Sequence, residues 1–408
     1  MLKNVSSTFF IMLIAMLSSF AVTIYFGRIL SVSDFGEFAL LKQILMTGST
    51  IAIFGLDYSY IKSFAKNPES GKNIHLLSLA VLGGISIIFV IGIAALYGYA
   101  IQKLSYILLS VFIGAMNLYV AAIYRLKRKF LIAQLLSGGW KIILMILVLG
   151  NFATNQSINM QFIYQLISIS FVVFSPFFIN VFYRAENKSS IHLDLRHYLT
   201  MGMIFWMINS AGLISGGVDK LVIPLLFGGE ILGIYTAISF IFTISLSMVG
   251  SAVGYVLFPK ISVGEKVNLK KMSLILVAIT FSATILFQII GVDMVRILFS
   301  EKYDNYLNPT LIFTFTIIGS LQVVHTILHF IISAKGNRRQ LLGYWGLTLF
   351  FIVLFISLLF AGRYFSSSIF LYLSIITIIT QSIKILTMML ILRKMNNNIS
   401  DGLKPKLV

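Results

Sequence analysis

Long hydrophobic runs separated by short polar segments set the pattern of this chain. A helix needs roughly 20 apolar residues to cross the hydrocarbon core of a bilayer. Runs of that length occupy residues 7–30, 38–62, 76–100, 104–124, 130–150, 161–183, 201–227, 231–258, 272–299, 310–334, 341–362 and 367–392. The pattern therefore predicts an all-α integral membrane protein with twelve spanning helices.

The composition excludes several classes of protein. Of the 408 residues, 58% are hydrophobic and 11% are charged, whereas soluble domains carry about 25% charged residues. The chain has no cysteine, and its histidines do not have the spacing of zinc ligands. We therefore expect no metal or cofactor. A net charge of +18 would suggest nucleic acid in a soluble protein, but its distribution along this chain indicates membrane topology and no nucleic-acid partner.

Basic residues alternate between the two sides of the predicted bundle. When the N-terminus is placed inside, Lys and Arg collect in every inner segment, and the outer loops hold only Arg28, Lys103, Lys302 and Arg363. Cytoplasmic loops carry this excess of positive charge. The pattern predicts a multi-pass protein of the bacterial inner membrane with both termini in the cytoplasm.

A faint internal repeat suggests two lobes. A Gly-x-aromatic step occurs at Gly36 near the start of the second run and again at Gly233 near the start of the eighth. Six helices in each repeat would give an N-terminal lobe, 1–190, a C-terminal lobe, 191–396, and a cytoplasmic tail, 397–408. Two lobes around a central cavity suit alternating access. Every loop is short, which disfavours a glycan polymerase with a large catalytic outer loop.

Ionisable side chains inside the predicted spans are candidate functional groups, because each costs roughly 2.5–3.5 kcal/mol to insert. They comprise Lys42, Lys141, Lys220, Lys384, Asp57, Asp219 and the pair Asp293 and Arg296. The last two are three residues apart and are interpreted as neutralising one another. His325 and His329 add two titratable groups in the tenth run.

Helical spacing gives several runs one polar face. In the fifth run, Gln134, Ser137, Gly138 and Lys141 align on a straight helix. Similar polar faces include Lys220 in the seventh run and Lys384 in the twelfth. We therefore expect these helices to share a hydrated, cationic interior within the bundle. Two alternatives stay open: lysines near helix ends can extend to the interface, and small polar residues also mediate helix packing. Lys141 lies roughly 16 Å from either end of its run, where such extension is hardest.

A cationic chamber under a lipid-facing cleft suits a polyprenyl-diphosphate-linked oligosaccharide. Lysines would bind the diphosphate, the cavity would shield the glycan, and the lipid tail would remain in the membrane. Asp57, Asp219, His325 and His329 are candidates for ion coupling or for balancing nearby lysines.

Three segments resemble the Wzx-type O-antigen flippases, in the polysaccharide-transporter branch of the multidrug/oligosaccharidyl-lipid/polysaccharide exporter superfamily. They are residues 27–39 (GRILSVSDFGEFA), residues 219–223 with 229–237 (DKLVI and GEILGIYTA), and residues 257–262 (LFPKIS). The resemblance implies a MATE-like fold and translocation of undecaprenyl-diphosphate-linked O-antigen units to the periplasmic leaflet. It draws attention to Arg28, Asp219 and Lys220 as matched positions, with other O-antigen assembly proteins as possible partners.

Two other functions compete with the flippase. A drug/cation antiporter of the same superfamily would need an anionic cavity, whereas the buried charges here are mainly basic. A membrane polymerase or acyltransferase would need a catalytic group of residues at an aqueous surface, and the sequence supplies none that is convincing. We therefore expect a transporter and no enzyme.

Overall fold

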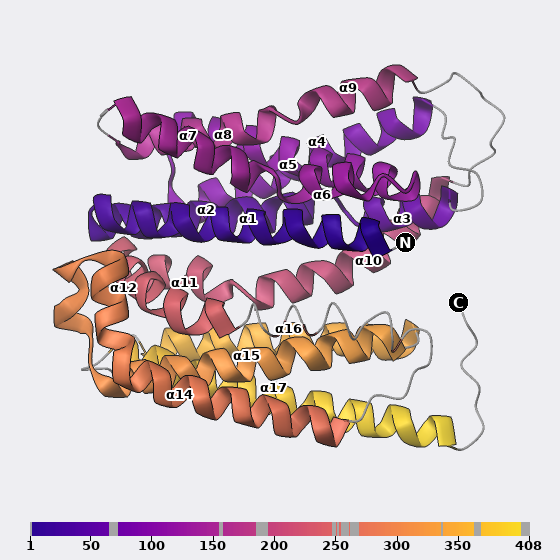
Figure 1. Cartoon of the computed structure of the whole chain (residues 1–408). Coiled ribbons are helices and arrows are strands. Elements are labelled where there is room, and N and C mark those ends of the chain that lie inside the picture. The colour runs from indigo at the N-terminus through magenta and orange to yellow at the C-terminus, as the bar shows by residue number, and fades with distance from the viewer. Residues whose placement is uncertain are drawn as a thin grey trace. The chain divides into compact units, whose positions relative to one another are not determined.

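The chain is all-helical wherever the structure describes it. The computed structural model describes residues 2–64, 72–154, 158–184, 195–246, 250, 253, 261, 269–335, 338–362 and 369–400, and these contain no strand. Its helices are drawn in Figure 1. Since a lipid-facing backbone must satisfy its own hydrogen bonds, an all-helical chain with this composition fits a membrane protein.

The described helices confirm nine of the predicted runs, and a tenth if one bent helix pair is a single span. Nine are long and apolar enough to span a bilayer, and a bent pair, Phe130–Gly138 with Trp140–Phe152, raises the number to as many as ten among the described residues. The other two predicted runs, 201–227 and 231–258, coincide with shorter helices or with residues outside the described ranges. The predicted number of twelve is therefore not reached within the described residues.

Two compact units, Met1–Gly217 and Val218–Val408, make up the chain. This division reflects packing, whereas the expected lobes, 1–190 and 191–396, reflect a repeat in the sequence, so those lobes stay a prediction. The expected tail is helical as far as Ser400, and residues 401–408 lie outside the described ranges.

The first unit is built around α5 (Ile101–Leu126), whose buried face carries small and aromatic residues such as Ala115, Ala121 and Tyr119. Helices α2, α3, α4, α6, α8 and α9 all pack on α5, and α1 packs on α6 and α7. The bounds are α1 Leu2–Ile29, α2 Val32–Ala52, α3 Leu56–Phe64, α4 Lys72–Tyr97, α6 Phe130–Gly138, α7 Trp140–Thr154, α8 Met160–Val172, α9 Ser175–Arg184 and α10 Leu195–Ser215.

The second unit is built around α15 (Pro309–Lys335), which packs most extensively on α17 (Ile369–Ser400). Its other elements are α11 Val218–Phe227, α12 Gly229–Ser239, the π-helix η1 Phe240–Ile244, α14 Leu269–Phe299, the 3-10 helix η2 Glu301–Tyr306 and α16 Arg338–Gly362. Helices α14 and α12 and the π-helix η1 also contact α15, and α16 packs on α17.

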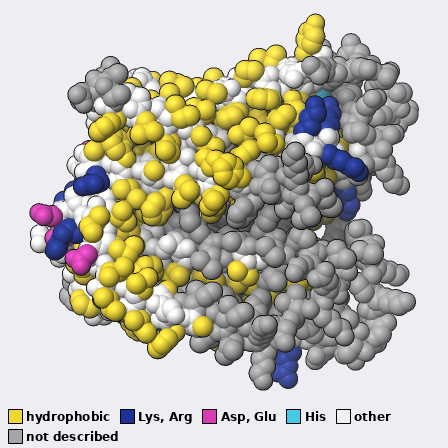
Figure 2. Space-filling view, viewed as in Figure 1, with side chains coloured by type: hydrophobic (Ala, Val, Ile, Leu, Met, Phe, Trp, Pro, Cys, Tyr) yellow, Lys and Arg dark blue, Asp and Glu magenta, His cyan; other side chains and the backbone are white. Residues whose placement is uncertain are grey.

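On the face drawn in Figure 2, hydrophobic side chains cover much of the described surface. On α4, Ile88 is 69% exposed and Ile91 is 63% exposed. A soluble protein rarely leaves such continuous apolar area uncovered. The surface therefore agrees with burial in lipid.

A break in the second predicted span separates α2 from α3. Phe54 and Gly55 both have positive φ values there, 52° and 67°. The backbone of Gly55 approaches that of Gly202 in α10 so closely that a Cβ on Gly55 would collide with the Gly202 carbonyl oxygen. The indole Nε1 of Trp206 in α10 donates to the Ile51 carbonyl at 2.9 Å. These contacts fasten α10 to the broken helix within the first unit.

Replacing Gly55 with Ala should destabilise the protein by at least about 2 kcal/mol, because strain at positive φ adds to the backbone collision. Thermal unfolding of the purified protein in detergent measures this. Gly98 is the matched control, since its φ is 61° but an added Cβ meets nothing within 4 Å. Gly98→Ala should cost only about 1 kcal/mol. Equal losses for the two variants would contradict the close approach of α3 and α10.

Candidate cationic cavity

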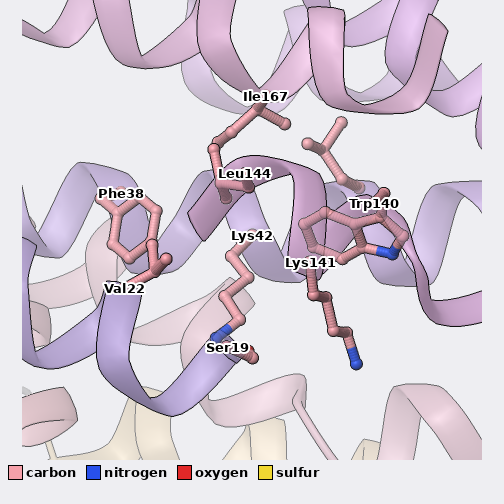
Figure 3. Close-up of a pocket in the computed structure, with 9 residues that line it drawn as sticks. Ser19, Val22, Phe38, Lys42, Trp140, Lys141, Leu144 and Ile167 are labelled. Atoms are coloured by element: carbon pink, nitrogen blue, oxygen red, sulfur yellow. The ribbon is translucent and has the colours of Figure 1, made fainter. Parts of the chain in front are cut away.

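A small cavity in the first unit brings together two of the predicted lysines. Its volume is about 10 Å³, room for about one water molecule. Helices α1, α2, α7 and α8 supply the lining residues Ser19, Val22, Phe38, Lys42, Leu45, Trp140, Lys141, Leu144 and Ile167. Figure 3 shows the lysines reaching from different helices among mainly apolar neighbours. No carboxylate is among these nine residues, so the lining is basic.

Lys42 is tethered to the neighbouring helix α1. Its Nζ donates a hydrogen bond to Thr23 Oγ1 at 3.0 Å, and the Thr23 hydroxyl donates to the Ser19 carbonyl at 2.7 Å. In Figure 3 the end of the Lys42 side chain lies beside Ser19. A buried ammonium group needs such polar partners. These hydrogen bonds explain the position of the Lys42 side chain without its extending to the membrane surface.

Lys141 lies directly after a break in the fifth predicted span. Helices α6 and α7 meet at an angle of 56°. At the junction, a Cβ on Gly139 would collide with the Leu135 carbonyl oxygen, so glycine permits this geometry. The straight polar face expected through Gln134, Ser137 and Lys141 is therefore wrong, because helical periodicity does not continue across such a bend.

The break places the start of a helix inside the membrane domain. Lys141 is the second residue of α7, where backbone N–H groups carry partial positive charge. The Trp140 ring stacks on Phe171 with centroids 4.7 Å apart, and Lys141 Nζ lies 5.8 Å from the Trp140 ring centre. Among the described residues, no carboxylate forms an ion pair with Lys141. Ammonium groups and a helix N-terminus together suit an anionic ligand.

The other predicted residues of the first unit lie away from this cavity lining. Arg28 is exposed in the last turn of α1. Asp57 follows the α2–α3 break, and its Oδ1 is enclosed with no hydrogen-bond partner among the described residues. The guanidinium of Arg125 acts on Asp57 electrostatically.

In the second unit, the structure brings the predicted residues into two groups. On α11, Asp219 accepts a hydrogen bond from the Tyr235 hydroxyl at 2.7 Å, and Lys220 follows it, half-buried. Lys384 of α17 is 2% exposed and lies within electrostatic reach of His325 and His329 of α15. A lysine enclosed this far does not extend to an interface. The single chamber expected from both halves of the chain stays a prediction.

Three ion pairs among the described residues lie near the ends of helices. Asp293 and Arg296 pair as expected, at 3.8 Å, and Arg296 Nε also donates to Asp304 Oδ2 at 2.9 Å. Sequence reasoning missed the Arg296–Asp304 pair. It also missed the pair in which Glu37 contacts Lys103 at 2.5 Å and accepts from the Tyr164 hydroxyl at 3.0 Å. Glu37 lies within one of the resembling segments, but nothing local in the sequence indicates its partners on α5 and α8.

Sequence reasoning also missed Ser19 and Trp140 as lining residues. The sequence does mark Trp140, since two glycines followed by this tryptophan and a lysine interrupt an otherwise apolar run. Ser19 had none, because a single serine in an apolar helix is common.

Comparisons with known proteins agree with this architecture. The chain is similar to a multidrug resistance MATE family transporter of the MOP superfamily in its inward-facing conformation, with TM-score 0.69, 15% identity, 94% of this chain covered and 96% of the other. The outward-facing conformation of such a transporter has a TM-score of 0.60 and 14% identity, with 97% of this chain and 96% of the other covered. The Vibrio cholerae MATE transporter VcmN in the bent form has a TM-score of 0.57 and 14% identity, with 97% of each chain covered. At these identities the likeness establishes the fold, which is that of MATE transporters.

The sequence itself matches a protein family. Comparison with curated protein sequences gives no match. Residues 1–265, which include the whole first unit and its cavity, match the family described as "Polysaccharide biosynthesis protein". With a family match over most of its length and the fold of MATE transporters, this multi-pass membrane chain belongs to the polysaccharide biosynthesis protein family.

Proposed function

We propose that this protein is a flippase that moves an undecaprenyl-diphosphate-linked oligosaccharide, of the O-antigen repeat-unit class, from the cytoplasmic to the periplasmic leaflet. The observation that carries the proposal is the pair Lys42 and Lys141 in one cavity whose lining holds no carboxylate. The family match supports a role in polysaccharide biosynthesis, and the MATE fold supports transport by alternating access.

The chemistry of the substrate fits this cavity. A diphosphate carries several negative charges, and ammonium groups bind phosphate oxygens by charge-assisted hydrogen bonds. The start of α7 beside Lys141 adds backbone N–H donors. The cavity of about 10 Å³ admits about one water molecule. The proposal therefore requires the helices that line it to separate before a diphosphate enters.

The basic lining disfavours the second candidate, a drug/cation antiporter. That candidate is supported by the fold, since similar structures include multidrug resistance transporters. A cationic drug would meet two ammonium groups in this cavity, at a cost in electrostatic energy. The family match and the MATE fold favour a transporter over a polymerase or acyltransferase.

The glycan of a deletion strain tests the proposed function. Loss of a flippase should remove displayed O-antigen completely, whereas loss of a polymerase should leave single capped repeat units. Loss of a drug antiporter should leave the glycan intact and lower drug resistance instead. Unchanged glycan in the deletion strain would contradict the flippase.

Lys141→Met should reduce displayed O-antigen at least tenfold in a complemented deletion strain, because loss of a charge-assisted bond costs about 1.5–3 kcal/mol. Lys141→Arg should retain part of the activity. Lys62→Met, which changes an exposed lysine of α3, is the control and should display normally. Immunoblots establish that each variant is inserted in equal amount. Normal display by inserted Lys141→Met would refute the role of Lys141.

Trp140 offers a direct test of what the cavity binds. The chain has three tryptophans, so Trp206→Phe with Trp345→Phe leaves Trp140 as the sole reporter. Undecaprenyl diphosphate should change its emission saturably, and Lys141→Met should weaken that binding about tenfold or more. The cationic dye ethidium should leave the emission unchanged. A saturable response to ethidium with none to undecaprenyl diphosphate would favour the antiporter.

A further inference from the structure

Helix α10 is fastened to the broken second span along three of its turns. Near its start, the Tyr198 carbonyl accepts a hydrogen bond from Ser59 Oγ of α3 at 2.6 Å. Four residues later, Gly202 meets the backbone of Gly55, and after four more, Trp206 Nε1 donates to a main-chain carbonyl of α2. Residues spaced by four lie on one face of a helix, so a single face of α10 makes these contacts. We name these five residues the α3–α10 clasp.

Hydrogen bonds and close packing hold α10 in this position. Two ring pairs flank the clasp: Tyr58 stacks on Phe205 with centroids 5.2 Å apart, and the centroids of Phe54 and Trp206 are 5.5 Å apart. Within a membrane, helix association gains little from the hydrophobic effect, because lipid tails are as apolar as the helix surfaces. The contacts of the clasp therefore decide whether α10 stays docked.

The segment that follows α10 reaches the helix that carries Lys42. A Cβ on Gly217 would collide with the side chain of Gln43 in α2, and Gln43 is the next residue after Lys42. The contacts of α10 and Gly217 thus extend along α2 from Gln43 to the break after Ala52. This stretch includes Leu45, which lines the cavity. Helix α10 and the residues after it therefore brace the part of α2 that forms one wall of the cavity.

Helix α10 is also the link in the chain between the two units. It packs on α2 and α3 of the first unit, whereas the sequence repeat predicted that it belongs to the second lobe, 191–396. Through Gly216 and Gly217 it continues directly into α11, the first helix of the second unit. A helix in this position can change its packing partners when the protein changes conformation.

One polar atom close to the clasp in the chain is left unsatisfied. Asp57 lies two residues after Gly55, and its Oδ1 is enclosed with no hydrogen-bond partner among the described residues. An enclosed polar atom without a partner is costly, and contact with water removes that cost. The docked conformation is therefore held against a cost that access of water would relieve.

We propose that α10 is a latch: while the clasp holds it on α3, the cavity around Lys42 and Lys141 stays closed, and its release lets α2 move and the cavity open. The volume of about 10 Å³ requires such an opening, since a diphosphate is larger than one water molecule. That the opening admits a diphosphate rests on the proposed function, whereas docking and release of α10 do not.

Alkylation of a buried cysteine measures the release without any substrate. The chain has no cysteine, so Ser59→Cys supplies the only thiol, at a position that is 0% exposed while α10 is docked. Ser110→Cys is the matched control, because Ser110 is 1% exposed and its Oγ lies 2.9 Å from Ser168 Oγ of α8, away from the clasp. In nanodiscs, N-ethylmaleimide should modify the thiol of Ser59→Cys at least about tenfold faster than that of Ser110→Cys, because release uncovers only the first. Both thiols should react alike after unfolding in SDS, and equal rates in the folded proteins would overturn the latch.

A cross-link tests whether release is needed for transport. Tyr58→Cys with Phe205→Cys joins α3 to α10, and Ser110→Cys with Ser168→Cys joins α5 to α8 as the control. Intact mass spectrometry confirms each disulfide. Oxidation of the first pair should slow flipping of a fluorescent polyprenyl-diphosphate sugar at least about tenfold, and dithiothreitol should restore it, whereas the control pair should flip at the same rate before and after oxidation.

Unimpaired flipping by the protein with the oxidised first pair would overturn the latch. Fast alkylation of Ser59→Cys in a protein that flips no glycan lipid would instead overturn the proposed function.

Discussion

The cost of holding an ammonium group within an apolar membrane domain is the constraint on which this account depends. Such a charge persists only where polar partners, a hydrated cavity or a ligand compensates it. The two units compensate the buried charge in different ways. In the first, Lys42 is tethered to Thr23 and Lys141 lies beside a small cavity. In the second, Lys384 is enclosed beside two imidazoles. Because each of these groups is costly to hold within the membrane domain, they are the side chains on which the proposed function rests.

Helix breaks connect the fold to these sites. The glycine at the α6–α7 junction allows a bend of 56°, which places Lys141 at the start of a helix. At the α2–α3 junction, positive φ values at Phe54 and Gly55 let α10 approach and dock through Trp206. In membrane transporters, broken helices expose backbone groups where a cavity must be lined. A continuous helix at the α6–α7 junction would no longer place Lys141 at the start of a helix, and one at the α2–α3 junction would remove the close approach of α10.

The length of the hydrophobic runs predicted the helical class and nine or ten of the spans, since the thickness of the bilayer sets the length of an apolar run. The pairing of Asp293 with Arg296 was also predictable, because the residues are neighbours on one helix. The bend at Gly139 was not predictable, since two adjacent glycines indicate that a helix can bend but do not specify the angle. The grouping of Lys42 with Lys141, and of Lys384 with two histidines, depends on contacts between distant segments that periodicity does not specify.

The central claim is that the basic cavity of the first unit recognises the diphosphate during translocation. The most direct measurement is flipping of a fluorescent, short-chain polyprenyl-diphosphate sugar in proteoliposomes, followed by quenching of the dye in the outer leaflet. The account predicts that the wild-type protein exposes lipid from the inner leaflet, and that the double variant Lys42→Met with Lys141→Met loses this activity while remaining folded and inserted. Equal flipping by the folded double variant and the wild-type protein would contradict it.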